Sequence, residues 1–141
     1  MKKLLSLAVA LLAFAAAPQL ACAQAIVGTP LAVSSGNKAN TSAAAVLPAV
    51  SGLRTWITGF TVTAGGATSA SLVNVTVSDG TWTLTYAFGF PAGATAAAVP
   101  LVVTFPNAVP SSAVNTAITV TLPAGGSGNT NASVTAVGFQ Q

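Results

Sequence analysis

One stretch of sequence, VNVTVSDGTWTLTY at residues 73–86, decides the fold. It consists of two runs in which apolar and polar residues alternate, joined by Asp79-Gly80. Alternation with period two is typical of strands that bury one face. Asp-Gly between two such runs is a strong signal for a two-residue hairpin loop, because a type I′ turn needs positive φ at both central positions. We therefore predict an antiparallel hairpin in which Ser78 pairs with Thr81.

The register of this predicted hairpin places its large apolar residues on one face. Each step outward from the loop fixes the next pair, and a slip of one residue would destroy the agreement between the two runs. The predicted apolar pairs are Val77 with Trp82, Val75 with Leu84 and Val73 with Tyr86, and the predicted polar pairs are Thr76 with Thr83 and Asn74 with Thr85. Trp82 and Tyr86 are therefore expected to point into the core.

Other segments repeat this alternation, separated by Gly, Pro or Asn. Their predicted inward residues are Trp56, Phe60 and Val62, then Leu101, Val103 and Phe105, and finally Ile118, Val120 and Leu122. Weaker candidate strands are residues 26–33, 43–50 and 133–139. After the first 23 residues no run has the period and length of a helix. Together these segments predict an all-β fold, a single β-sandwich of about eight antiparallel strands.

The composition excludes most enzyme classes. Among 141 residues there are four Lys or Arg, one Asp or Glu, one Cys and no His. Charged residues make up 4% of the chain, against about 25% in an ordinary globular domain. Without His there is no Ser-His-Asp or Cys-His nucleophile, and one acid cannot form a catalytic carboxylate pair. We expect a protein that is not an enzyme, with no catalytic, cofactor-binding or metal-binding residues.

The beginning of the chain predicts export. Lys2-Lys3 precedes an apolar run of 14 residues, Leu4–Ala17, and Ala21-Cys22-Ala23 follows. This order is typical of a secretory signal peptide over residues 1–23, and the run is shorter than the ~20 residues of a spanning helix, so no stable membrane span is expected. The mature domain then covers residues 24–141, of which 24–42 are open to forming an extended arm. Its expected location is the periplasm, the cell surface or the extracellular space.

Cys22 leaves an alternative open, because a cysteine after an apolar run is the lipidated residue of bacterial lipoproteins. Here Leu20 stands one place too close to Cys22 for that signal. Cleavage after Ala23 would leave a mature chain without cysteine, and hence without a disulfide.

The predicted mature chain carries almost no charge, since only Lys38, Arg54 and Asp79 remain in it. Nucleic-acid binding requires clusters of Lys and Arg, so no nucleic-acid partner is expected. Edge strands are ordinarily protected by charge or proline, and the scarcity of charge therefore predicts a homo-oligomer. The last predicted strand is apolar on both faces, which makes a candidate interface of the residues Val134, Val137 and Phe139, together with Arg54.

Several segments resemble known proteins. They are residues 52–63 (GLRTWITGFTVT), 100–106, 115–123 (NTAITVTLP) and 128–140. In these turn and strand patterns, over about residues 43–141, the chain resembles small TNF-like jelly-roll proteins of phage, prophage and bacterial secreted type. The resemblance implies a compact jelly roll, a trimer and a structural or attachment role, and it carries over no catalytic residue.

These observations favour a secreted, non-enzymatic structural or adhesive β-sandwich that self-assembles at the cell surface or outside the cell. One alternative is a carbohydrate-binding module that stacks a surface glycan on Trp56, Trp82 or Tyr86. Such a module would expose these rings on a single face. Another alternative is a phage or prophage virion decoration or fibre protein, which requires that the signal peptide is not used.

Overall fold

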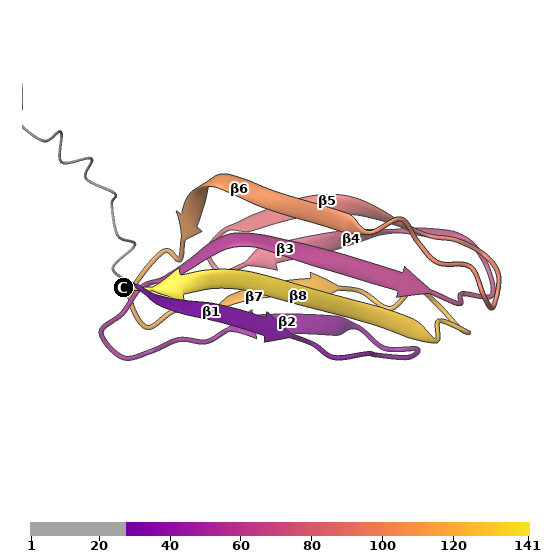
Figure 1. Ribbon diagram of the computed structural model, residues 1–141, viewed down its shortest axis with the longest axis horizontal. Helices are drawn as coiled ribbons and strands as arrows, with labels where there is room; N and C mark the ends of the chain where they lie inside the picture. The colour runs from indigo at the N-terminus through magenta and orange to yellow at the C-terminus, as the bar shows by residue number, and fades with distance from the viewer. Residues whose placement is uncertain (1–27) are drawn as a thin grey trace, which may run out of the picture.

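The computed structural model describes residues 28–141 and shows two antiparallel four-stranded sheets packed face to face (Figure 1). The strands are β1 (Thr29–Ser34), β2 (Ala43–Leu47), β3 (Thr55–Gly65), β4 (Ser71–Ser78), β5 (Thr83–Phe90), β6 (Leu101–Pro110), β7 (Ile118–Leu122) and β8 (Asn131–Gln140). No helix occurs within residues 28–141, so the predicted all-β sandwich of about eight strands is confirmed. The predicted signal peptide, residues 1–23 with Cys22, lies outside the described residues.

The strand order is that of a jelly roll. Sheet A has the order β1-β8-β3-β6 and sheet B the order β2-β7-β4-β5. The antiparallel pairs β1/β8, β2/β7, β3/β6 and β4/β5 nest inside one another as in a single long hairpin. This hairpin is rolled up so that β8 also pairs with β3 and β7 with β4. In such a double-sheet roll, most backbone hydrogen-bonding groups of the strands are paired within one chain.

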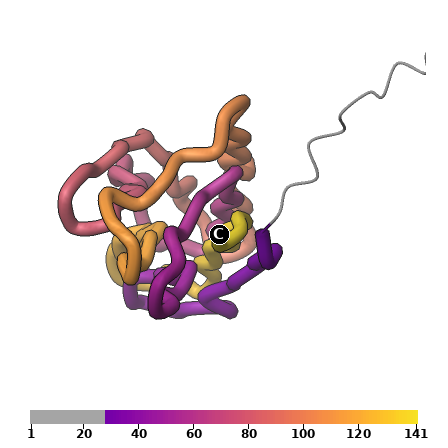
Figure 2. The backbone as a smooth tube through the Cα atoms, turned by 90° about the vertical axis from the view of Figure 1, so that its left-hand side faces the viewer, coloured from indigo at the N-terminus to yellow at the C-terminus, as the bar shows by residue number. Residues whose placement is uncertain are grey.

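The described segment that precedes β2 contributes to this roll. Of residues 24–42, which the sequence left open as an extended arm, Thr29–Ser34 form β1, an edge strand of sheet A. β8 lies beside it in the middle of the same sheet. Figure 2, a view along the strands, places the C-terminus near the middle of this end of the molecule, in agreement with the central position of β8.

The predicted hairpin exists as β4 and β5, but its register was predicted wrongly by two residues. Val77 pairs with Leu84 and Val75 with Tyr86, and the loop has four residues, Asp79 to Trp82. A shift of two residues keeps every side chain on its own face. Trp82 and Tyr86 are accordingly half-buried against the core, on the predicted side.

The wider loop has a clear local cause. The Asp79 carboxylate accepts hydrogen bonds from the backbone N–H groups of Thr81, at 2.8 Å, and Trp82, at 3.0 Å. Within the described part of the chain, Asn40 and Asn115 are the residues other than glycine with positive φ, so Asp79 does not occupy the type I′ turn position predicted for it. The aspartate acts through its side chain, which organises a loop of four residues.

A β-bulge in β3 corrects a second prediction. The register of β3 against β8 shifts between Ile57 and Gly59, so Thr58 is an extra residue relative to β8. On the other side of β3, residues 105–108 of β6 lie between the partners of Ile57 and Gly59. Ile57 faces the core with none of its surface exposed, while Trp56 faces outward and does not share a face with Phe60 and Val62. An extra residue reverses the alternation beyond it, which the prediction did not allow for.

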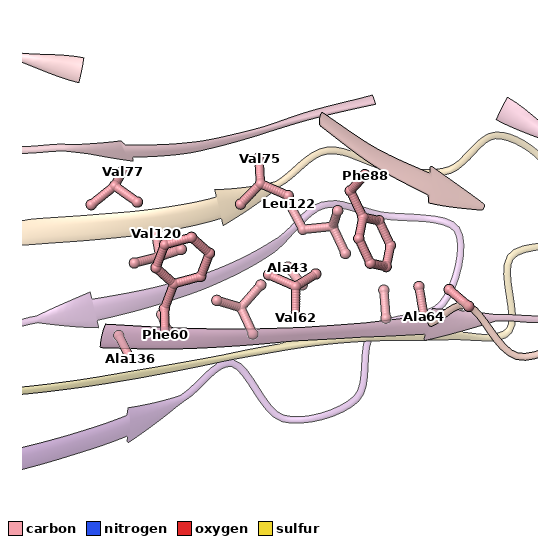
Figure 3. Packing of buried hydrophobic residues seen from close by; sticks show 14 of the residues in the cluster. Ala43, Phe60, Val62, Ala64, Val75, Val77, Phe88, Val120, Leu122 and Ala136 are labelled. Atoms are coloured by element: carbon pink, nitrogen blue, oxygen red, sulfur yellow. The ribbon is translucent and has the colours of Figure 1, made fainter. Parts of the chain in front are cut away.

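The core between the sheets consists of aliphatic and aromatic side chains that point inward from both sheets (Figure 3). Figure 3 shows Val75, Val77 and Phe88 pointing from one layer toward Phe60 and Val62 of the other. The predicted inward residues Ile118, Val120 and Leu122 are fully buried, and Leu101, Val103 and Phe105 are half-buried against the core. Both sets are therefore confirmed.

Candidate functional site

Side chains that could ligate a metal are not grouped in the described part of the chain. Residues 28–141 contain no group of three or more His, Cys, Asp or Glu side chains that could hold a metal ion. No helix in this part of the chain is long and apolar enough to cross a membrane. The candidate functional features of the described residues are therefore surfaces, which differ in the polarity of their side chains.

Asp79 has a structural environment. Besides the two N–H groups of its own loop, its carboxylate accepts a hydrogen bond from the backbone N–H of Ser112, which joins the β4–β5 loop to the β6–β7 loop. Partial burial acts to raise the pKa of Asp79, but the hydrogen bonds from Ser112, Trp82 and Thr81 outweigh it and hold this pKa well below its usual value of 3.8. A carboxylate saturated with donors and kept ionised is a poor proton acceptor.

The outer face of sheet A carries a row of aromatic and proline residues across all four strands. Pro30 of β1 is opposite Phe139 of β8, which is opposite Trp56 of β3, which is opposite Pro110 of β6. The rings of Trp56 and Phe139 are stacked, with centroids 5.8 Å apart and planes inclined by 7°. The Trp56 Nε1 atom is buried without a hydrogen-bond partner. We call these four residues the aromatic–proline row.

The next rows of the same face continue its uncharged character. Val137 is 39% exposed and Val102 is 65% exposed, and between them lies a depression of about 200 Å³ over Gly59. Threonines, among them Thr104 and Thr135, complete the lining. Gly59 lets the backbones approach closely here, because a Cβ at this position would lie 2.6 Å from the Val103 carbonyl oxygen.

The four residues predicted to form an interface do not lie on one surface. Val137 and Phe139 lie on the outer face of sheet A. Val134 is fully buried between the sheets, so its prediction as an interface residue is corrected: β8 is a central strand and its inner face is covered by the chain itself. Arg54, just before β3, donates a side-chain hydrogen bond of 3.4 Å to the Ser112 carbonyl and is paired through its backbone with Gln141.

The outer face of sheet B is different, because hydroxyl groups form two of its rows, while Val46 and Leu72 are exposed at separate positions on it. Thr121 of β7, Thr76 of β4 and Thr85 of β5 form one row across three strands, and Thr119, Ser78 and Thr83 form the next. These side chains are half-buried or exposed. Hydroxyl groups hydrogen-bond readily to water, so this face is satisfied as a solvent-exposed surface.

The sandwich is open along the side formed by β5 and β6. Inward residues of β2 and β7 such as Leu47 and Val120 are fully buried. The inward residues of the first half of β5, Leu84 and Tyr86, and of β6 up to Phe105 are only half-buried although they pack against the core, whereas Phe88 and Phe90 further along β5 are buried. Phe60 lies between the two strands, with ring centroids 5.2 Å from Tyr86 and 6.3 Å from Phe105. We call this surface the open flank; it consists of Trp82, Leu84, Tyr86, Leu101, Val103 and Phe105.

The three aromatic residues proposed to stack a glycan do not share a surface. Trp56 lies on the outer face of sheet A, with one ring face against Phe139. Trp82 and Tyr86 belong to the open flank and pack against the core. A flat sugar-stacking platform needs ring faces presented together to solvent, and this arrangement does not provide one from these residues.

Sequence reasoning missed two features at the loops. A hollow of about 420 Å³ lies at one end of the molecule and is lined by Phe90, Pro91, Val99 and neighbouring small residues, none of them ionisable. The side chain of Asn129 is fully buried without a hydrogen-bond partner for either polar atom. Gly-rich and Ala-rich loops carry no periodic pattern, so no signal in the sequence points to either feature.

No protein-family model, curated protein or solved structure matches the chain. The described residues define a jelly-roll domain whose distinguishing features are the aromatic–proline row on the outer face of sheet A, the hydroxyl rows on the outer face of sheet B and the open flank.

Proposed function

We propose that this protein is an exported, non-enzymatic structural or adhesive module that self-assembles at the cell surface or outside the cell. The observation that carries the proposal is the contrast between the two outer faces. Sheet B presents threonine and serine hydroxyls to solvent, with Val46 and Leu72 exposed at two separate positions, whereas sheet A groups its apolar residues in the aromatic–proline row with Val137 and Val102. Contiguous exposed apolar surface on a small domain is typical of an interaction site.

A second copy of the same chain is the partner that this face fits. No charged residue lies among the rows of sheet A that face outward, so nothing repels an identical face. With strands of up to 11 residues spaced by about 4.8 Å, four strands present roughly 600 Å². This area approaches the ~800 Å² that each partner contributes to a standard stable interface.

The non-enzymatic part of the proposal is supported by the role of Asp79, the one acidic residue in the whole sequence. Its carboxylate is committed to backbone donors of two loops. Acid–base catalysis needs a group that can exchange its proton near the working pH.

Sedimentation of the chain from Gln24 to Gln141 tests the proposal. Val137→Asp places a charge on the outer face of sheet A and is expected to weaken self-association at least about tenfold. Asn74→Asp places the same charge on the outer face of sheet B and should leave association unchanged, because Asn74 is exposed on a central strand of that sheet. Val102→Asp is a second variant on the outer face of sheet A. Val102 is more exposed than Val137, so a charge there is less able to disturb folding and should still weaken association. Equal association of Val137→Asp and Asn74→Asp would contradict the proposal.

A further inference from the structure

The four sheet edges of the molecule are protected unequally. β1 is six residues long and contains Pro30, β2 has five residues, and β6 contains Pro106 and Pro110. Short strands and prolines are the means by which natural sheets avoid pairing with other chains. β5 has eight residues without proline or charge, and among the strands of residues 28–141 it pairs only with β4. Its free edge is therefore a complete template for another strand.

The open flank lies along this same edge. Leu84 and Tyr86 of β5 and Leu101 and Val103 of β6 point inward but remain half-buried, since no segment within residues 28–141 covers them fully on this side. Backbone hydrogen-bonding groups and apolar side chains are thus left uncovered together. A partner that added one strand to β5 would cover both.

We infer that the partner is a second copy, whose β5 pairs antiparallel with this β5 across a two-fold axis. The two copies of sheet B then form one continuous eight-stranded sheet, and each open flank is covered by the other. This inference rests on the proposed self-assembly and names a surface for it that is separate from the outer face of sheet A.

The chemistry of β5 fits its own copy. The outward residues Thr83, Thr85, Ala87 and Gly89 are small and uncharged, so two copies can lie side by side without like charges facing each other. A two-fold contact uses the same edge on both chains and closes after two copies. Each chain has one edge of this kind, so pairing stops at the dimer.

Pairing would satisfy the backbone groups at the free edge of β5 in both copies. Two eight-residue strands form up to about eight hydrogen bonds between them. The half-buried side chains of the open flank add apolar surface to the contact.

Two-fold symmetry makes a sharp geometric demand. Residues directly opposite each other in an antiparallel pair point to the same face, whereas neighbours along a strand alternate. One residue of β5 must therefore pair with its own copy at the axis. Its Cα atoms would lie about 4.5–5.5 Å apart, within the range that a disulfide can bridge.

A cysteine scan of the chain from Gln24 to Gln141 tests this, because residues 24–141 contain no cysteine. Single cysteines from Thr83 to Phe90 are oxidised mildly and covalent dimers are measured. We expect a peak at one position, lower yield two residues away, and no dimer for Ala44→Cys on the edge strand β2. Equal yields along β5, or a dimer from Ala44→Cys, would overturn the pairing.

A second pair of variants separates this inference from the proposed function. Thr85→Lys puts like charges on the two edges, while Thr76→Lys puts the same charge on the central strand β4 directly opposite Thr85. Only Thr85→Lys is expected to abolish the β5 cross-link. Absence of the cross-link in a chain that still associates in a manner sensitive to Val137→Asp overturns the β5 pairing and leaves the proposed function standing. A chain that never associates overturns both.

Discussion

Asp79 illustrates how much a single side chain can determine in a chain with so few charges. Its carboxylate binds N–H groups of its own loop and of Ser112, 33 residues further along the chain. The Asp-Gly pair suggested a two-residue turn, but that expectation used only the local sequence. The donor from Ser112 arrives through the tertiary fold, and no local pattern reveals it.

The pH dependence of stability should therefore come mainly from Asp79. Its pKa in the folded state is lowered, by hydrogen bonds that outweigh partial burial, relative to about 3.9 in the unfolded chain. The stabilisation is present at pH values above the unfolded pKa and is lost as pH falls through the folded pKa. Urea unfolding should give a nearly constant free energy between about pH 5 and 8, and a decline below about pH 4.

Asp79→Asn is expected to remove most of this decline, since it keeps an acceptor oxygen but cannot titrate. Asp79→Ala loses the acceptor and should destabilise the fold by about 1–2 kcal/mol at neutral pH. An acid-range decline that persists unchanged in Asp79→Asn would show that another group is responsible.

Gly59 and Gly89 form a matched pair for testing close backbone approach. A Cβ on Gly59 would lie 2.6 Å from the Val103 carbonyl oxygen, whereas a Cβ on Gly89 would meet nothing within 4 Å. Gly59→Ala should lower the free energy of unfolding by about 1–3 kcal/mol. Gly89→Ala should leave it unchanged or raise it slightly, by less than about 1 kcal/mol. Thermal or urea unfolding checks both, and equal effects would contradict the geometry at the bulge.

At the scale of elements, alternation in the sequence predicts which residues face inward but not where a strand deviates from regularity. The inward sets of β6 and β7 were predicted correctly because these runs keep period two. Trp56 was misplaced because the bulge at Thr58 depends on partners from β6 and β8, including the hydrogen bond from the Thr58 hydroxyl to the Val137 carbonyl at 3.1 Å. Register and bulges are decided by such distant contacts.

Hydrogen exchange tests the inference about β5 at this scale. Both β5 and β2 are edge strands of sheet B, so in a monomer the free edge of each should exchange readily. If β5 pairs with a second copy, hydrogen exchange of the backbone amides that point to its free edge, away from β4, should slow as protein concentration rises. The amides of β2 should show no such dependence, and a parallel slowing of both strands would contradict specific pairing.

At the scale of the whole molecule, the sequence indicates the character of the surface better than its location. The scarcity of charge is evident from composition, and it predicts association. The grouping of Trp56 with Phe139 results from the bulge, and the open flank results from β5 and β6 being edge strands on the same side. Both depend on the complete topology, which is why the candidate interface from sequence included the buried Val134 and missed Trp56 and Pro110.

Self-association is the central claim, and the molar mass of the unmodified chain tests it most directly. Light scattering on the chain from Gln24 to Gln141, from micromolar to millimolar concentrations, should give a mass that is a multiple of the single chain and falls on dilution. A mass equal to one chain at every concentration would contradict the account.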